Sequence, residues 1–119
     1  MVRKFTMYSD HMRIEERSLA LHGEIAKRLH TRRELVGVAR KNLEQWIQRD
    51  GETPPLTEWR RILGQPLEDI INFLVSPGEK ARQLRQSSPF CGILTPRERW
   101  KIYEAFSAGT YYQSRRKHR

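Results

Sequence analysis

The chain has 119 residues, of which 37% are hydrophobic and 31% are charged, and its formal net charge is +9. This length allows one domain with a modest core and excludes a two-domain enzyme. The lack of long apolar runs excludes a membrane-spanning helix. A single cysteine, Cys91, excludes an internal disulfide and is compatible with a reducing cytoplasm. We expect it to be a small buried apolar side chain rather than a reactive thiol.

The positive charge is concentrated at the ends of the chain. Four of the nine net positive charges come from the last five residues, as Arg115, Arg116, Lys117 and Arg119. The first residues are also basic but contain no apolar stretch of the kind found in secretion signals, so we expect a cytoplasmic protein. We expect residues 1–13 to form an irregular arm, residues 14–106 a helical domain and residues 107–119 a flexible basic tail.

Apolar residues at helical spacing predict a first helix over about 14–29 and a second over about 31–48. The expected buried stripe of the first helix contains Ile14, Leu21, Ile25 and Leu29. Thr31 and Glu34 form a capping-box pattern at the start of the second helix. His22 lies near the apolar stripe of the first helix. We interpret it as a packing histidine with its hydrogen bonds satisfied rather than a metal ligand, because no cysteine or second histidine stands at ligand spacing.

The middle of the chain predicts two short helices that contribute much of the core. The first covers residues 56–63, and its expected inward side chains are Leu56, Trp59, Ile62 and Leu63. The second covers residues 67–75 and has the strongest apolar stripe of the chain, so we expect it to be central. The pair has the rhythm of a helix-turn-helix, but its second helix is acidic and apolar, which is the wrong surface for a DNA major groove.

The next stretch contains two helix-start patterns separated by a linker. Residues 76–79 (SPGE) and 95–98 (TPRE) each combine a cap, a proline and a glutamate three residues after the cap. They predict a short, lightly buried helix and a last helix over about 96–106. Proline and glycine prevent residues 87–92 from continuing a helix. The linker is nevertheless apolar, so we expect it to fold back onto the core through Phe90, Ile93 and Leu94.

These elements predict an all-α fold, a single compact bundle of about five to six short-to-medium helices. The sequence contains no glycine-rich phosphate loop, no cysteine pair and no histidine pair at metal spacing. The adjacent carboxylates Glu15–Glu16 and Glu68–Asp69 point in different directions on a helix and make poor catalytic pairs. We therefore expect no enzymatic activity, no cofactor and no metal.

Several stretches carry a resemblance to a bacterial family. They are residues 15–22 (EERSLALH), 39–43 (ARKNL), 58–59 (EW), 84–90 (LRQSSPF), 92–95 (GILT) and 98–99 (ER). The region spanning residues 15–106 resembles the region that follows an Xre-type helix-turn-helix in antitoxin-like regulators, and the RQSSPF run is its most specific part. The resemblance implies a cytoplasmic, antitoxin-like protein whose helical body engages a toxin encoded beside it.

Two functional hypotheses follow from the sequence. The first is a non-enzymatic antitoxin-like protein that neutralises a cognate toxin by direct contact through exposed arginine and aromatic side chains. The candidate contact residues are Arg82, Arg85, Phe90, Trp100 and Tyr103. Alternatively, Phe90 and Trp100 belong to the core, and the two arginines secure the linker by hydrogen bonds to the backbone.

The second hypothesis is a nucleic-acid-binding protein, such as a DNA-binding transcriptional regulator, that uses the basic ends. Aromatic side chains beside arginines can stack on bases and pair with phosphates. The candidate contact residues are Arg115, Arg116, Lys117 and Arg119. Both hypotheses are compatible with a homo-oligomer or a hetero-oligomer, and neither requires a membrane.

Overall fold

The computed structural model describes the backbone of residues 2–105 and the side chains of residues 13–105. Over this range the chain is helical and has no β-strand, which confirms the predicted all-α fold class. The elements are α1 (Val2–Thr31), the 3-10 helix η1 (Arg33–Leu35), α2 (Val36–Asp50), α3 (Pro54–Leu63), α4 (Leu67–Leu74) and α5 (Glu79–Arg85). A last helix follows, of which residues 96–105 are described.

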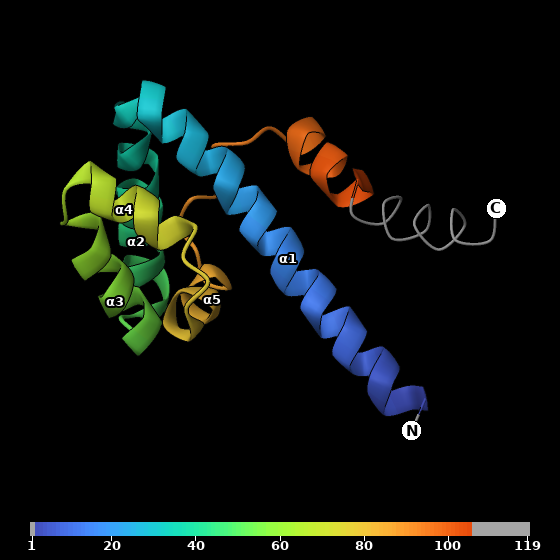
Figure 1. Cartoon of the computed structure of the whole chain (residues 1–119). Coiled ribbons are helices and arrows are strands. Elements are labelled where there is room, and N and C mark those ends of the chain that lie inside the picture. Colours follow the sequence, from blue (N-terminus) through green and yellow to red (C-terminus); the bar gives the residue numbers. More distant parts are fainter. Residues whose placement is uncertain (1, 106–119) are drawn as a thin grey trace.

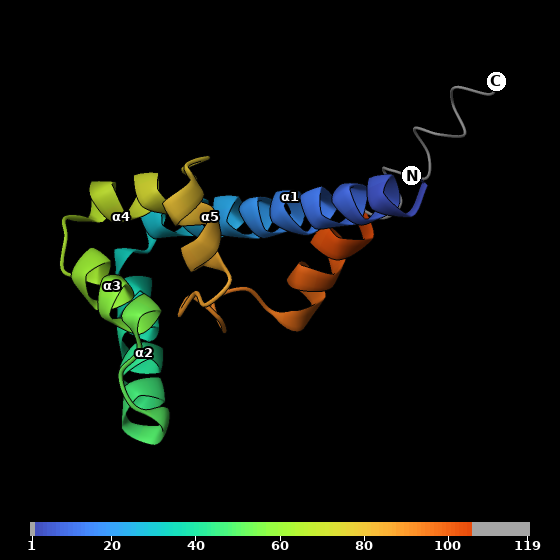
Figure 2. The same ribbon diagram turned by 90° about the horizontal axis from the view of Figure 1, so that it is seen from below.

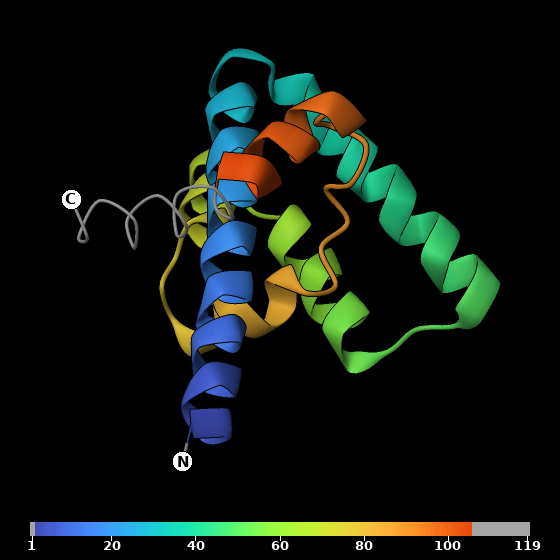
Figure 3. The ribbon, with the colours of Figure 1, turned by 90° about the vertical axis from the view of Figure 1, so that its right-hand side faces the viewer.

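The long helix α1 organises the arrangement. The helices α2, α3 and α4 gather around its C-terminal end, and its N-terminal end projects past them (Figure 1). Figure 2 shows that α2 turns away from α1, whereas the last helix lies alongside it. The segment after α5 passes between α1 and α2 before it enters the last helix, which lies against α1 (Figure 3). The last helix therefore lies next to α1, although it follows α5 in the chain (Figure 3).

The N-terminal segment differs from its prediction. The helix α1 begins at Val2, not near residue 14, so the expectation of an irregular arm over residues 1–13 is wrong for the backbone from Val2 onward. The segment contains neither proline nor glycine, so nothing in it stops the helix from continuing. Ile14, which the sequence pattern placed on the buried stripe, is 52% exposed.

The core is centred on Trp59. Its ring meets those of Phe73 and Phe90 edge-on, with 5.6 and 6.0 Å between ring centroids, a geometry that aromatic pairs favour. The indole nitrogen of Trp59 donates a hydrogen bond of 2.9 Å to the carbonyl oxygen of Leu84. The four predicted inward side chains of α3 are all buried, as are Ile70, Ile71 and Leu74 of α4. The sequence prediction of these two helix faces is confirmed.

The three predicted caps have different outcomes. The Thr31–Glu34 box does not form, because Thr31 Oγ1 donates to the carbonyl of Arg28 and Glu34 pairs with Arg32. Ser76 does not cap α5 directly either. Its Oγ accepts a hydrogen bond from the backbone of Gly78, which is the residue before the helix. The box at Thr95 forms as predicted and is described below.

Candidate functional site

The linker between α5 and the last helix lies on the core, as its composition predicts. Its buried side chains are Pro89, Phe90, Ile93 and Leu94. Asn42 of α2 secures it, since its Nδ2 donates to the carbonyl oxygens of Pro89 and Cys91, both at 2.9 Å. The chain then turns at Gly92, whose φ of 90° favours glycine. Cys91 is exposed, so the prediction that it is buried is wrong. Its neighbour Phe90 takes the inward position.

Two of the predicted contact residues are buried and cannot serve as exposed contacts. Phe90 is 1% exposed and packs on Trp59, and Arg85 is 5% exposed. The Nη1 of Arg85 donates to the carbonyl oxygens of Leu74 and Ser76, at 3.2 and 2.8 Å. The alternative interpretation, in which arginine binds backbone carbonyls, therefore holds for Arg85. These carbonyls belong to the connection between α4 and α5 rather than to the linker.

Arg82 lies on the exposed side of α5. Its Nη1 forms an ion pair of 3.3 Å with the carboxylate of Glu15 on α1. Its guanidinium therefore already has a partner within the chain, and this contact links α5 to α1. An exposed pair of this kind contributes little to stability.

The last helix is fixed against α1 at two points. At its start, the backbone of Thr95 donates to Glu98 Oε1 at 2.9 Å, and the backbone of Glu98 donates to Thr95 Oγ1 at 3.1 Å, which is the predicted capping box. The same carboxylate accepts hydrogen bonds from both Nη atoms of Arg28 on α1. Further along, the guanidinium of Arg17 lies 4.5 Å from the ring centroid of Tyr103. The order of these contacts shows that the two helices run antiparallel.

The outer surface of the last helix holds an exposed tryptophan among charged side chains. Its residues, at helical spacing, are Arg97, Trp100, Lys101 and Glu104, and we call this surface the Trp100 face. All four are exposed, and Trp100 is 64% exposed. Within the described residues neither Arg97 nor Lys101 has an ion-pair partner. Large aromatic side chains are seldom this exposed on an ordered helix, and they are enriched where proteins bind each other.

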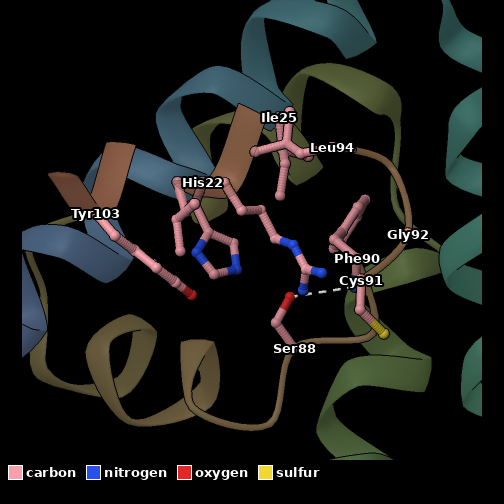
Figure 4. A pocket seen from close by; sticks show the side chains of 10 residues that line it. His22, Ile25, Ser88, Phe90, Cys91, Gly92, Leu94 and Tyr103 are labelled. Atoms are coloured by element: carbon pink, nitrogen blue, oxygen red, sulfur yellow. Dashed lines mark hydrogen bonds between the residues drawn. The ribbon is translucent and has the colours of Figure 1, made fainter. Parts of the chain in front are cut away.

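A pocket of about 140 Å³ lies on the other side of the last helix, between that helix, α1 and the linker (Figure 4). It is lined by Leu21, His22, Ile25, Ser88, Phe90, Cys91, Gly92, Leu94, Arg99 and Tyr103. The inner wall is largely aliphatic and aromatic, and the polar groups come from three separate segments of the chain.

His22 is the buried polar group of this pocket. It is 6% exposed, and its Nδ1 lies 2.8 Å from the carbonyl oxygen of Ser18. A carbonyl only accepts hydrogen bonds, so Nδ1 carries the proton. Burial is the largest cause that lowers the pKa of His22 to about 4, and the nearby Arg85 lowers it further, against the raising effect of the Ser18 carbonyl. The imidazole is therefore neutral at pH 7. Its Nε2 is a buried acceptor that has no hydrogen-bond partner among the described residues.

The sequence pattern missed this unsatisfied nitrogen. The interpretation of His22 as a packing histidine is right for its burial and for Nδ1, but not for Nε2. No sequence signal identifies the pocket, because its walls come from α1, the linker and the last helix. Figure 4 shows the ring of His22 directed into the space that Ser88, Phe90 and Tyr103 surround.

Other kinds of site are not seen in the part of the chain that the structure describes. No group of three or more His, Cys, Asp or Glu side chains is placed to bind a metal ion there. Within residues 2–105 we also find no helix whose length and apolar character would let it cross a bilayer. The predicted nucleic-acid contacts Arg115, Arg116, Lys117 and Arg119 lie outside the described residues.

Comparison with known proteins gives no match to a family model, to a curated protein or to a solved structure. The resemblance to antitoxin-like regulators stays a hypothesis from the sequence. Of the five predicted contact residues, Trp100 and Tyr103 lie on one helix, and only Trp100 is both exposed and unengaged within the described residues.

Proposed function

We propose that the protein is a non-enzymatic binding protein that docks a partner protein through its Trp100 face. The observation that supports this most is the 64% exposure of Trp100 on a helix fixed to α1. Completing the burial of a tryptophan in a partner's apolar pocket contributes on the order of 3 kcal/mol. This is enough for one residue to dominate an interface of modest size.

The support of the last helix favours tight binding. The capping box at Thr95 and the contact of Glu98 with Arg28 hold the helix before any partner arrives. A side chain presented on a fixed helix loses less conformational entropy on binding than one on a mobile segment. The helix therefore acts as a preformed contact element.

The charges around Trp100 favour an acidic partner surface. Arg97 and Lys101 border the indole and have no ion-pair partner within the described residues, whereas Glu104 is the single acidic member of the Trp100 face. Carboxylates around an apolar pocket would complement this arrangement and speed association at low salt. We expect the partner to be a protein that offers such a pocket.

We further propose that this partner is a toxin encoded beside the protein and that docking neutralises it in the cytoplasm, as in an antitoxin. The support for this step is the sequence resemblance over residues 15–106. Direct contact would cover the toxin's active site or its substrate channel. No chemistry by the antitoxin itself is required.

Growth of cells that express the neighbouring gene tests the proposal. We expect that gene's product alone to arrest growth and co-expression of the present chain to restore it. Trp100→Ala should abolish the rescue. The matched control is Val75→Ala, because Val75 is also an exposed large apolar side chain, at 40%. Rescue that survives Trp100→Ala contradicts the proposed face, and a harmless neighbouring product contradicts the antitoxin assignment.

A second candidate function, nucleic-acid binding, is favoured by the net charge of +9 and its concentration at the C-terminus. Such binding would be weakly specific and would weaken steeply as salt rises. Deleting residues 115–119 should reduce affinity for duplex DNA and leave binding to the protein partner unchanged. If the deletion abolishes partner binding instead, the basic end is part of the protein interface.

A further inference from the structure

The polar groups of the pocket define what could bind there. The innermost one is Nε2 of His22, an acceptor that needs a donor. Around it are the hydroxyl groups of Ser88 and Tyr103, both of which line the pocket. Ser88 Oγ accepts a hydrogen bond from the backbone of Phe90 at 3.2 Å, and its own proton is free to turn toward the pocket. A ligand that places a hydroxyl group here would satisfy the buried nitrogen.

The volume and the walls favour a single aromatic ring. The pocket measures about 140 Å³, and an engineered protein cavity of about 150 Å³ is known to hold benzene. Leu21, Ile25, Phe90 and Leu94 supply apolar contacts on several sides. A ring fills this space with van der Waals contact, whereas a water molecule alone would leave most of it empty.

The pocket also carries a positive charge. Arg99 lines it, is exposed, and has no ion-pair partner within the described residues. A guanidinium favours a carboxylate, to which it can donate two parallel hydrogen bonds. The acceptor of His22 and the donors of Arg99 therefore select a ligand that carries both a hydroxyl group and an anion.

We propose that this pocket binds a small phenolic carboxylate, with its hydroxyl on Nε2 of His22, its ring among the apolar side chains and its carboxylate beside Arg99. This binding is independent of the docking proposed for the Trp100 face, since the two surfaces lie on different sides of the last helix. The two proposals can therefore fail separately.

The contact with His22 is tested with the uncharged probes p-cresol and toluene, which differ by the hydroxyl group. The ¹⁵N resonances of the imidazoles are followed at pH 7 in the full chain. We expect p-cresol to shift the Nε2 resonance of His22 saturably and to bind about tenfold more tightly than toluene, the effect of one hydrogen bond to a buried acceptor. The resonances of exposed His30 should not move.

His22→Leu should fold, because an apolar side chain of similar size replaces an unsatisfied polar one. In this variant p-cresol and toluene should bind equally well. Failure of p-cresol to shift the His22 resonance overturns the proposal and leaves only water in the pocket. An equal preference in the wild-type protein and in His22→Leu overturns the placement of the hydroxyl.

The contact with Arg99 is tested with 4-hydroxyphenylacetate at low salt. It should bind about threefold more tightly than p-cresol, the effect of one solvent-exposed ion pair. Arg99→Gln should remove this gain. The control is Arg97→Gln, on the same helix but outside the pocket, which should keep it. A gain that is unchanged in Arg99→Gln overturns the placement of the carboxylate.

Discussion

Two buried polar side chains, His22 and Arg85, lie close together and interact with the chain in opposite ways. Nη1 of Arg85 donates hydrogen bonds to the carbonyl oxygens of Leu74 and Ser76, and so connects α5 to the end of α4. His22 has one nitrogen satisfied by Ser18 and one without a partner. The hydrogen bonds of Arg85 stabilise the fold. The unsatisfied nitrogen of His22 lowers the stability of the fold, as expected for a group that contacts a ligand.

At this scale the pKa of His22 predicts a pH dependence of folding. The pKa is about 4 in the folded protein and 6.5 in the unfolded chain, so the unfolded chain binds more protons between these values. The neutral imidazole of His22 therefore contributes fully to the free energy of unfolding above about pH 6.5. This contribution, roughly 3 kcal/mol, is lost as the pH falls toward 4. The charged or titratable groups around His22 are Arg85, Arg99 and Tyr103.

Denaturant unfolding at pH 7 and pH 4 measures this effect. His22→Leu should lose less stability over that range than the wild-type protein does, because it has no imidazole to charge. The comparison removes the contribution of the carboxylates, which titrate in both proteins. Equal losses in the two proteins would show that His22 does not control the acid sensitivity.

The role of Arg85 predicts a stability difference between two neighbouring arginines. Arg85→Met keeps most of the side-chain volume but leaves two carbonyls without their charged donor, so we expect it to lower the free energy of unfolding by about 2 kcal/mol. Arg82→Met removes only the exposed ion pair with Glu15 and should cost less than about 0.5 kcal/mol. Thermal or urea unfolding of both variants checks this, and equal losses would contradict it.

At the scale of elements, one side chain has two roles at the start of the last helix. Glu98 completes the capping box and also binds Arg28 of α1, so a single carboxylate both starts the helix and fixes its position. The contact connects residues 70 positions apart in the chain. The helix should therefore be the part of the fold most sensitive to a change at Glu98.

Glu98→Ala should loosen the last helix and leave the core intact. We expect amide hydrogen exchange to accelerate over residues 97–105, by a factor that corresponds to about 2 kcal/mol, while α3 and α4 keep their protection. The matched control is Glu104→Ala, which changes an exposed glutamate on the same helix and should leave exchange at residues 97 and 98 unchanged. Uniform acceleration through α3 would show instead that Glu98 supports the whole fold.

Sequence patterns predicted the elements that local chemistry determines. Proline and glycine mark the ends of α3 and the linker, and the spacing of Trp59 and Ile62 identifies a buried face. The same patterns failed for α1, because residues 2–13 have no apolar stripe although the helix continues through them. They also misplaced Ile14 and Cys91, since which side of a segment is covered depends on where distant elements pack.

The candidate sites also combine features that the local sequence determines with features that depend on how distant elements pack. Trp100 and Phe90 are both apolar aromatic side chains near the end of the chain, yet one is exposed and the other is buried under Trp59. Which of the two is buried depends on the path of the linker, which carries Phe90 onto the core. The pocket at His22 could not be predicted, because it forms only where α1, the linker and the last helix meet.

At the scale of the whole molecule, the shape is more open than a bundle of this length requires. The Cα radius of gyration is 16.3 Å, against about 13 Å for a compact domain of similar size. The difference reflects α1, whose N-terminal end projects past the other helices (Figure 1). An open shape with net charge +9 exposes much charged surface to solvent.

The central claim is that the Trp100 face binds a partner protein, and affinity capture tests it most directly. The tagged chain, its Trp100→Ala variant and its Val75→Ala variant are each incubated with native extract at moderate salt after nuclease treatment. We predict that the wild-type chain and Val75→Ala retain one stoichiometric acidic protein, the product of the neighbouring gene, and that Trp100→Ala loses it. Equal retention by all three, or nucleic acid that is released as salt rises with no protein retained, would contradict the claim.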